Sequence, residues 1–249
     1  MKALAALVLV GLLALSARPA AAINGYPSGH AGDIPRDVTA AQVVSDADVQ
    51  AKIDRLVQFR PSRGAAVVRR VAAAMERGLG ARRRSYDAFL RARLRDFEGI
   101  VEHYGMRAND LSTARAFAIV AGYKAYNGDH LTDATSGSIF RTMLALQTAA
   151  PQWYEPWSDA RKQDLYTRWA LQGSVLNWLD DEARKHSDTA AHAAVRVQAR
   201  LFLRQQLGRD PDTVKLDQFA CAVYRDEDCG SLMRRLRSAF ETSTVVRSP

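Results

Sequence analysis

The clearest amphipathic pattern in the chain runs from Leu90 to Tyr104. Apolar residues recur there at steps of four, three, four and three, at Leu90, Leu94, Phe97, Val101 and Tyr104, which is the spacing of one face of an α-helix. Ser85 precedes the run as a candidate N-cap, and Gly105 follows it where helices often end in a left-handed residue. The pattern predicts a helix that begins after Ser85 and buries one side.

The segment from Ala114 to Tyr126 has a different character. It is apolar or small on nearly every side, and Arg115 and Lys124 are its only charged residues. A helix that is apolar all round is buried at the centre of a fold. We therefore expect this segment to form the central helix, capped by Asn109 or Asp110, with its alanines and Gly122 allowing neighbouring helices to approach closely.

Further helices are predicted by the same periodicity. The first begins after Ser45 and ends at Pro61, and the second runs from Ala65 to about Leu79. A third includes Ile139 to Leu146, a fourth follows Ser158, and a fifth follows Ser187 or Asp188 and runs to Leu207. Two shorter helices are expected between Asp210 and Phe240. No alternation of apolar and polar residues is long enough to indicate a sheet. We expect an all-α fold: a single-domain bundle of about seven to nine helices.

The first residues have the pattern of a secretory signal peptide. Lys2 precedes an apolar run from Ala3 to Leu15, and Ala20 to Ala22 provide small residues for cleavage after Ala22. We expect residues 1–22 to be a signal peptide, 23–44 a mobile leader rich in Gly and Pro, 45–241 the helical domain and 242–249 a frayed tail. No later stretch reaches the roughly 18 apolar residues of a membrane span. The expected location is therefore periplasmic or secreted.

Two stretches resemble a family of exported bacterial helical proteins whose function is uncharacterised. The first is HYGMRANDLSTARAFAIVAGYKAYNGD, residues 103–129, and the second is SDARKQDLYTRWALQGSVLNWL, residues 158–179. With the order of helices, the similarity covers roughly Asp46 to Leu216. Such a resemblance implies a helical domain but transfers no catalytic residue, and the C-terminal cysteine segment departs from the family pattern.

The composition of the chain excludes two classes of protein, wholly disordered chains and scaffolds built on disulfides. The chain has 249 residues, 47% of them hydrophobic, and a formal net charge of +8, which excludes a wholly disordered chain. Two cysteines are too few for a disulfide-built scaffold. In an oxidising compartment we expect Cys221 and Cys229 to form one disulfide. Catalysis by this pair is disfavoured, because seven residues separate the cysteines instead of the two found in thiol oxidoreductases.

Arginine is concentrated between Arg60 and Arg95. If these side chains share one face, they form a field suited to phosphates, anionic glycans or acidic proteins; otherwise they are solvated helix faces. The candidate anion-binding residues are Arg82, Arg83, Arg84, Arg91 and Arg95. Because export separates the protein from nucleic acid, we expect an anionic envelope component or an acidic protein as the partner.

A second basic stripe and an aromatic cluster are less specific. Arg196, Arg200 and Arg204 follow at i, i+4 spacing, and we expect acids within the fold to neutralise them, with Asp180, Asp181 and Glu182 available upstream. Trp153, Tyr154 and Trp157 lie around Pro151 and Pro156, where they form either a ligand surface or a hydrophobic lid. Trp169 and Trp178 are expected in the core.

The sequence contains no motif that identifies an enzyme. It lacks His pairs at i, i+4, the His-Glu-x-x-His and Gly-x-Ser-x-Gly motifs, and a phosphate-binding glycine loop. We therefore assign no catalytic residue, metal ligand or cofactor. The first hypothesis is a non-enzymatic, exported helical binding protein of the bacterial envelope; the alternative is an envelope hydrolase whose site is assembled from separated helices. A deep cleft holding a carboxylate or histidine favours the hydrolase, and a basic surface favours binding.

Overall fold

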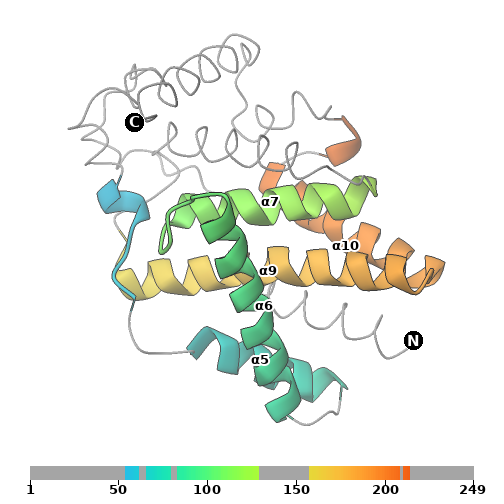
Figure 1. Cartoon of the computed structure of the whole chain (residues 1–249), viewed down its shortest axis with the longest axis horizontal. Coiled ribbons are helices and arrows are strands. Elements are labelled where there is room, and N and C mark those ends of the chain that lie inside the picture. The colour runs from blue at the N-terminus through green and yellow to red at the C-terminus, as the bar shows by residue number, and fades with distance from the viewer. Residues whose placement is uncertain (1–53, 62–65, 80–82, 129–156, 208–209, 214–249) are drawn as a thin grey trace.

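The computed structural model describes residues 54–61, 66–79, 83–128, 157–207 and 210–213 (Figure 1). Its regular elements are helices α5 (Ala66–Leu79), α6 (Arg83–His103), α7 (Leu111–Asn127), α9 (Asp159–Lys185) and α10 (Thr189–Leu207), and the 3-10 helix η2 (Pro211–Thr213). These residues include no strand, only an isolated bridge between Gln58 and Asp110. The all-α prediction is therefore confirmed for this part of the chain.

Several predictions concern residues outside the described ranges. These are the signal peptide, the leader, the C-terminal tail, the helices around Ile139 and after Asp210, and the side chains of Arg82, Trp153, Tyr154, Cys221 and Cys229. The total of seven to nine helices and the single domain also stay predictions. Among the described helices, none is both long enough and apolar enough to cross a membrane.

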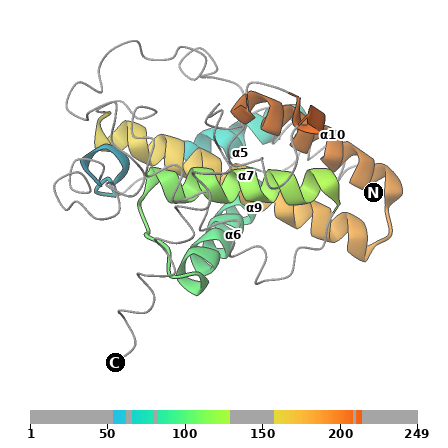
Figure 2. The ribbon, with the colours of Figure 1, turned by 90° about the horizontal axis from the view of Figure 1, so that it is seen from above.

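Helices α7 and α9 run parallel to each other and share the most extensive helix contact. Phe117 of α7 lies beside Gly173 of α9, and Lys124 lies within 3.5 Å of Asp181 about two turns further along both helices. Figure 2 shows α7 across the middle of the molecule with α9 beneath it. The order of these contacts shows that α7 and α9 begin at the same end of the bundle.

Helix α10 folds back against both α7 and α9 and runs antiparallel to them. Arg115 near the start of α7 donates a hydrogen bond to Gln206 near the end of α10, while Arg196 near the start of α10 bonds to Tyr126 at the end of α7. Between these contacts, a Cβ built on Gly122 would lie only 2.8 Å from the ring of Phe202. The glycine therefore permits the close approach of α7 and α10.

The central position of α7 is confirmed. Thirteen of its 17 residues are buried, because α9 packs on one side and α10 on another. Asp110 is the N-cap, and its carboxylate accepts the backbone N–H groups of Ser112 and Thr113, which otherwise have no partner within the first turn. The cap, the small residues and the absence of interior charges except Arg115 and Lys124 together explain this buried helix.

Helices α5 and α6 form a second layer, and α6 crosses α9 (Figure 1). The predicted faces are the buried ones: Val67, Val68, Val71 and Met75 on α5, and Leu90, Phe97 and Val101 on α6. One prediction is wrong. Helix α6 begins at Arg83, so Ser85 lies inside its first turn and cannot be the N-cap, which requires non-helical backbone angles.

The first predicted helix ends at Val57 and not at Pro61, whereas the ends predicted at Gly105, Ser158 and Asp188 are correct. Gly105 has a φ of +63° after α6, and Ser158 caps α9 by accepting the N–H of Arg161. Asp188 accepts the N–H of Ala191 at the start of α10. Trp169 is buried, and Trp178 packs against the core from a partly buried position.

Candidate functional site

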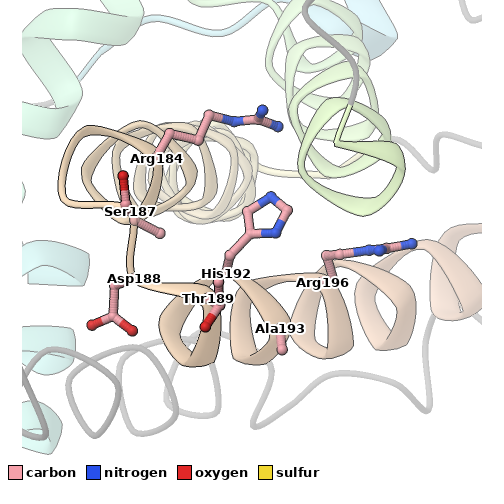
Figure 3. A pocket seen from close by; sticks show the side chains of 8 residues that line it. Arg184, Ser187, Asp188, Thr189, His192, Ala193 and Arg196 are labelled. Carbon is pink, nitrogen blue, oxygen red and sulfur yellow. The ribbon is translucent and has the colours of Figure 1, made fainter.

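A pocket lies at the tight connection between α9 and α10, beside the C-terminal end of α7 (Figure 3). Its volume is about 580 Å³, and it is lined by Ala183, Arg184, Ser187, Asp188, Thr189, His192, Ala193 and Arg196. The pocket is open to solvent on one side. It is thus a surface recess between three helix ends, not a deep cleft.

The local sequence explains the sharp connection. Ser187 has a φ of +52°, and the N–H groups of Ser187 and Asp188 donate to the carbonyl oxygens of Arg184 and Ala183, each at 2.9 Å. These bonds satisfy the last carbonyls of α9. The Asp188 carboxylate then accepts the N–H of Ala191 at 3.0 Å. The end of α9 and the start of α10 are thereby held together.

Asp180 of α9 lies beneath the pocket and contacts two of its basic side chains, Arg184 and His192. Its side chain is fully buried, with Arg184 Nε at 2.9 Å from Oδ2 and His192 Nε2 at 3.2 Å from Oδ1. A buried carboxylate is costly without such partners. Because Arg184 belongs to α9 and His192 to α10, Asp180 lies at the junction of the two helices, hydrogen-bonded to Arg184 and within ion-pair distance of His192. Figure 3 shows both reaching toward α7.

The C-terminal end of α7 lies against the side chains of Arg184 and His192. Gly128 has a φ of +72° and ends α7 in a left-handed conformation, and a Cβ built on it would lie 3.6 Å from His192 Cε1 and 3.7 Å from Arg184 Nη2. Arg196 Nε donates to the carbonyl oxygen of Tyr126 at 2.9 Å. Cations near a helix C-terminus are favourable, because the carbonyl groups there carry partial negative charge. Part of the basic character of the pocket therefore stabilises α7.

The pocket has donors on Arg184 and Arg196, a carboxylate on Asp188 and hydroxyl groups on Ser187 and Thr189. Asp180 is buried between Arg184 and His192, and Asp188 caps α10. Arg196 is exposed and uses Nε for Tyr126, while the described residues offer no partner for its other two guanidinium nitrogens. A guanidinium fork of this kind suits a carboxylate or a phosphate.

Arg91 and Arg95, the candidates from the sequence whose side chains the structure describes, do not line this pocket. Arg91 forms an ion pair with Asp87 on the same helix at 2.7 Å, and Arg95 is exposed on α6. Arg83 and Arg84 lie in the first turn of α6, where their side chains are not described, and Arg82 lies outside the described residues. The guanidinium carbon of Arg93 lies 5.5 Å from the centres of both the Phe89 and the Trp178 rings. The arginine-rich segment is therefore divided among different environments.

The predicted aromatic cluster is described only at Trp157. This side chain is partly buried and packs against the core, and the guanidinium carbon of Arg161 lies 4.8 Å from the centre of its ring. Both contacts favour the hydrophobic lid over an open ligand surface. Trp153 and Tyr154 lie outside the described residues.

Arg200 of the stripe on α10 is neutralised, but not by the acids expected from the sequence. Arg200 pairs with Asp210 and Asp212 at 2.9 and 2.8 Å. Asp180 is engaged with Arg184 and His192, Asp181 with Lys124, and Glu182 with Lys185 and His186. Arg200 lies about 18 Å along α10 from the connection to α9, so the chain that follows α10 is the nearer source of acids.

Sequence reasoning missed Asp180, Arg184 and His192 as a site. One signal was available, because Asp180 follows Trp169 and Leu176 at the helical spacing of buried positions. A charged residue in an apolar stripe indicates a buried partner. The partner itself depends on the connection between α9 and α10. Among the described residues, no group of three or more His, Cys, Asp or Glu side chains is placed to hold a metal ion.

A comparison with protein families identifies the family of this chain. No curated protein and no solved structure matches the chain. The model of a family described as "Family of unknown function (DUF6683)" matches residues 31–219, which include every described helix. The resemblance of the sequence to a family of uncharacterised function is thereby confirmed, and the chain belongs to DUF6683.

Proposed function

We propose that this protein is a non-enzymatic helical binding protein that receives a carboxylate or phosphate group of its partner in the pocket between α9 and α10. The observation that carries the proposal is that Arg184, His192 and Arg196 line one recess. The acids beside them are used inside the fold, Asp180 by two of these side chains and Asp188 by the start of α10.

Physical chemistry supports an anionic group in this position. A hydrogen bond to a charged group contributes about 1.5–3 kcal/mol, and the fork of Arg196 can form two to one carboxylate or phosphate. The hydroxyl groups of Ser187 and Thr189 line the same recess.

The binding experiment uses inorganic phosphate and acetate as probes, with isothermal titration calorimetry at low and high salt. Arg196→Gln is expected to weaken binding by about tenfold, the effect of losing one charge-assisted hydrogen bond. Arg95→Gln is the matched control, because Arg95 is also exposed but lies on α6. Loss of binding in Arg95→Gln with normal binding in Arg196→Gln would place the site on the arginine-rich segment instead.

The proposal includes export to the envelope, which the pattern of residues 1–22 supports. The partner is then an anionic envelope component or an acidic protein, and Cys221 and Cys229 are expected to form a disulfide there. Mass spectrometry of the purified envelope fraction tests this. A mature chain beginning at Ile23 is expected, and a cytoplasmic protein that retains Met1 contradicts it.

One observation favours the alternative, a hydrolase with a site assembled from separated helices. His192 of α10 faces the buried Asp180 of α9, and a carboxylate in that position can orient a general-base histidine. Ser187 lines the same pocket. Chromogenic ester substrates test this function: turnover that disappears in both Ser187→Ala and His192→Gln identifies an enzyme, and absence of turnover in the unmodified protein supports binding.

A further inference from the structure

The ring of His192 stands on α10 and points toward the ends of α9 and α7 (Figure 3). Its Nε2 lies 3.2 Å from Oδ1 of Asp180, whose side chain is fully buried, and neither of these two atoms forms a hydrogen bond with a described residue. A carboxylate oxygen and an unprotonated ring nitrogen are both acceptors, so the contact is favourable only when Nε2 carries a hydrogen. The second proton, which makes the ring cationic, is then taken up at Nδ1.

The charged side chains around His192 balance one another when its ring is neutral. Arg184 of α9 and Arg196, one turn further along α10, are positive. Asp180 beneath the ring and Asp188, one turn before it on α10, are negative. Histidine is the side chain that changes its charge between pH 5 and 8. Among the described groups of the pocket, protonation of His192 is therefore the step that changes a balanced site into a positively charged one.

The other described charges at this junction are paired with one another and do not line the pocket. Glu182 of α9 lies 3.8 Å from Lys185 and 3.5 Å from His186, and Lys124 of α7 lies 3.5 Å from Asp181. The end of α7 otherwise presents its backbone to the ring of His192, with partial negative charge on its last carbonyl groups. His186 titrates in the same pH range but pairs outside the pocket, so it is a natural control.

We propose that protonation of His192 regulates the pocket, which binds its anion tightly at mildly acidic pH and weakly above neutral pH. The inference rests on the proposed function, because it concerns the same anion site. A cationic ring attracts the anion beside Arg196, whereas a neutral ring adds no charge to the site. Because coupling between two bound species is reciprocal, the anion also favours the protonated form of His192 to the same extent.

The experiment measures sulfate binding to the full mature chain by isothermal titration calorimetry at about pH 5.5 and about pH 8, at constant ionic strength. Sulfate is the probe because its own charge does not change over this range. The affinity is expected to be about tenfold higher at the lower pH, the effect of one added charge at a protein surface. His192→Gln is expected to remove this difference, and His186→Gln, the matched control, to retain it.

Asp188→Asn tests the charge balance from the other side. Asparagine also caps a helix, so the start of α10 keeps its acceptor while the pocket loses one negative charge. This variant is expected to bind sulfate at about pH 8 roughly tenfold more tightly than the unmodified protein does. Unchanged affinity would show that the charges of the pocket do not control binding, and it would overturn the inference.

A second measurement needs no variant. The NMR signal of the His192 Cε1 proton follows the titration of the ring, and saturating sulfate is expected to move its midpoint upward by about one pH unit, the counterpart of the tenfold change in affinity. A midpoint that sulfate leaves in place, equal affinity at the two pH values, or a pH dependence that survives in His192→Gln overturns this inference but leaves the anion site standing. Absence of sulfate binding at both pH values overturns the proposed function, and this inference with it.

Discussion

Gly173 of α9 lies directly against the ring of Phe117 of α7. A Cβ atom built on Gly173 would lie 2.5 Å from Phe117 Cε1, 2.7 Å from Cδ1 and 3.0 Å from the Cα of Ala118. The ring is buried between α7, α9 and Phe97 of α6, so it has little room to move. This contact therefore sets the distance between the two helices with the most extensive interface.

The first prediction follows from this contact. Gly173→Ala is expected to lower the free energy of unfolding by about 1–3 kcal/mol, because overpacking forces the ring or the backbone of α7 to shift. Gly99→Ala on α6 is the matched control, since a Cβ there meets nothing within 4 Å and alanine favours a helix by up to about 1 kcal/mol. Urea unfolding measures both. A Gly173→Ala protein as stable as the unmodified one would contradict the packing described.

The helices could be predicted from the sequence where the determining forces are local. Apolar spacing located α5, α6 and α7, and Asp110, Gly105 and Ser158 marked helix ends, because each acts on neighbouring backbone groups. The prediction that Ser85 caps α6 is wrong, because the preference of one residue for the N-cap position is only one of the contributions that decide where a helix begins. The parallel arrangement of α7 and α9 has no local signal, because it depends on contacts such as that between Phe117 and Gly173.

The pocket was beyond sequence reasoning because its residues meet only in three dimensions. Asp180 and His192 come from different helices, and Gly128 comes from a third. The charge density of the arginine-rich segment was a misleading guide, because Arg91 is compensated by Asp87 and Arg93 packs against aromatic rings. Counting charges along a chain does not show which of them share a surface.

The second prediction concerns the buried carboxylate of the pocket. Asp180→Asn is expected to cost about 1.5–3 kcal/mol, because the hydrogen bond from Arg184 to a charged carboxylate is lost. Asp181→Asn is the control: Asp181 is 62% exposed, and its contact with Lys124 is at 3.5 Å, so the loss should stay below about 1 kcal/mol. Thermal and urea unfolding give both values. Similar losses in the two variants would show that Asp180 does not organise this region.

The third prediction concerns the cap of α7. Asp110→Ala is expected to lower the free energy of unfolding by about 1–2 kcal/mol, because the N–H groups of Ser112 and Thr113 lose their acceptor. Asp110→Asn should cost less, since the amide oxygen still accepts a hydrogen bond. If Asp110→Asn is as damaging as Asp110→Ala, the charge and not the hydrogen bond is the important feature of the cap.

The same residue gives a pH test with a defined sign. Burial raises the pKa of Asp110 above 3.8, although its bonds from the Thr113 and Ser112 amides and the charge of Arg107 act in the opposite direction. The folded protein therefore holds this proton more tightly than the unfolded chain. The stability that protonated Asp110 contributes is fully present below pH 3.8 and decreases as the pH rises through the pKa that Asp110 has in the folded protein. The stability of the unmodified protein relative to Asp110→Asn should decrease over this range, and an increase would contradict the shift.

The last prediction concerns Tyr166, whose ring lies between the edges of Phe59 and Phe97, with ring centres at 5.2 and 5.4 Å. Burial raises the pKa of this phenol from 10.0 to about 12, against the effect of a hydrogen bond with the backbone of Asn109. The unfolded chain therefore releases the proton first. The stabilising contribution is complete below pH 10 and is lost between pH 10 and 12, at up to about 1.4 kcal/mol per pH unit.

Tyr166→Phe cannot ionise at this position, so it should lose less stability than the unmodified protein over that range. Urea unfolding at pH 9 and pH 11 measures the difference, and ultraviolet absorbance of the unmodified protein minus that of Tyr166→Phe isolates the titration of this phenol. A difference titration centred near pH 10 would mean that water reaches Tyr166, and the packing of α9 against Phe59 and Phe97 would then be looser than these ring contacts require.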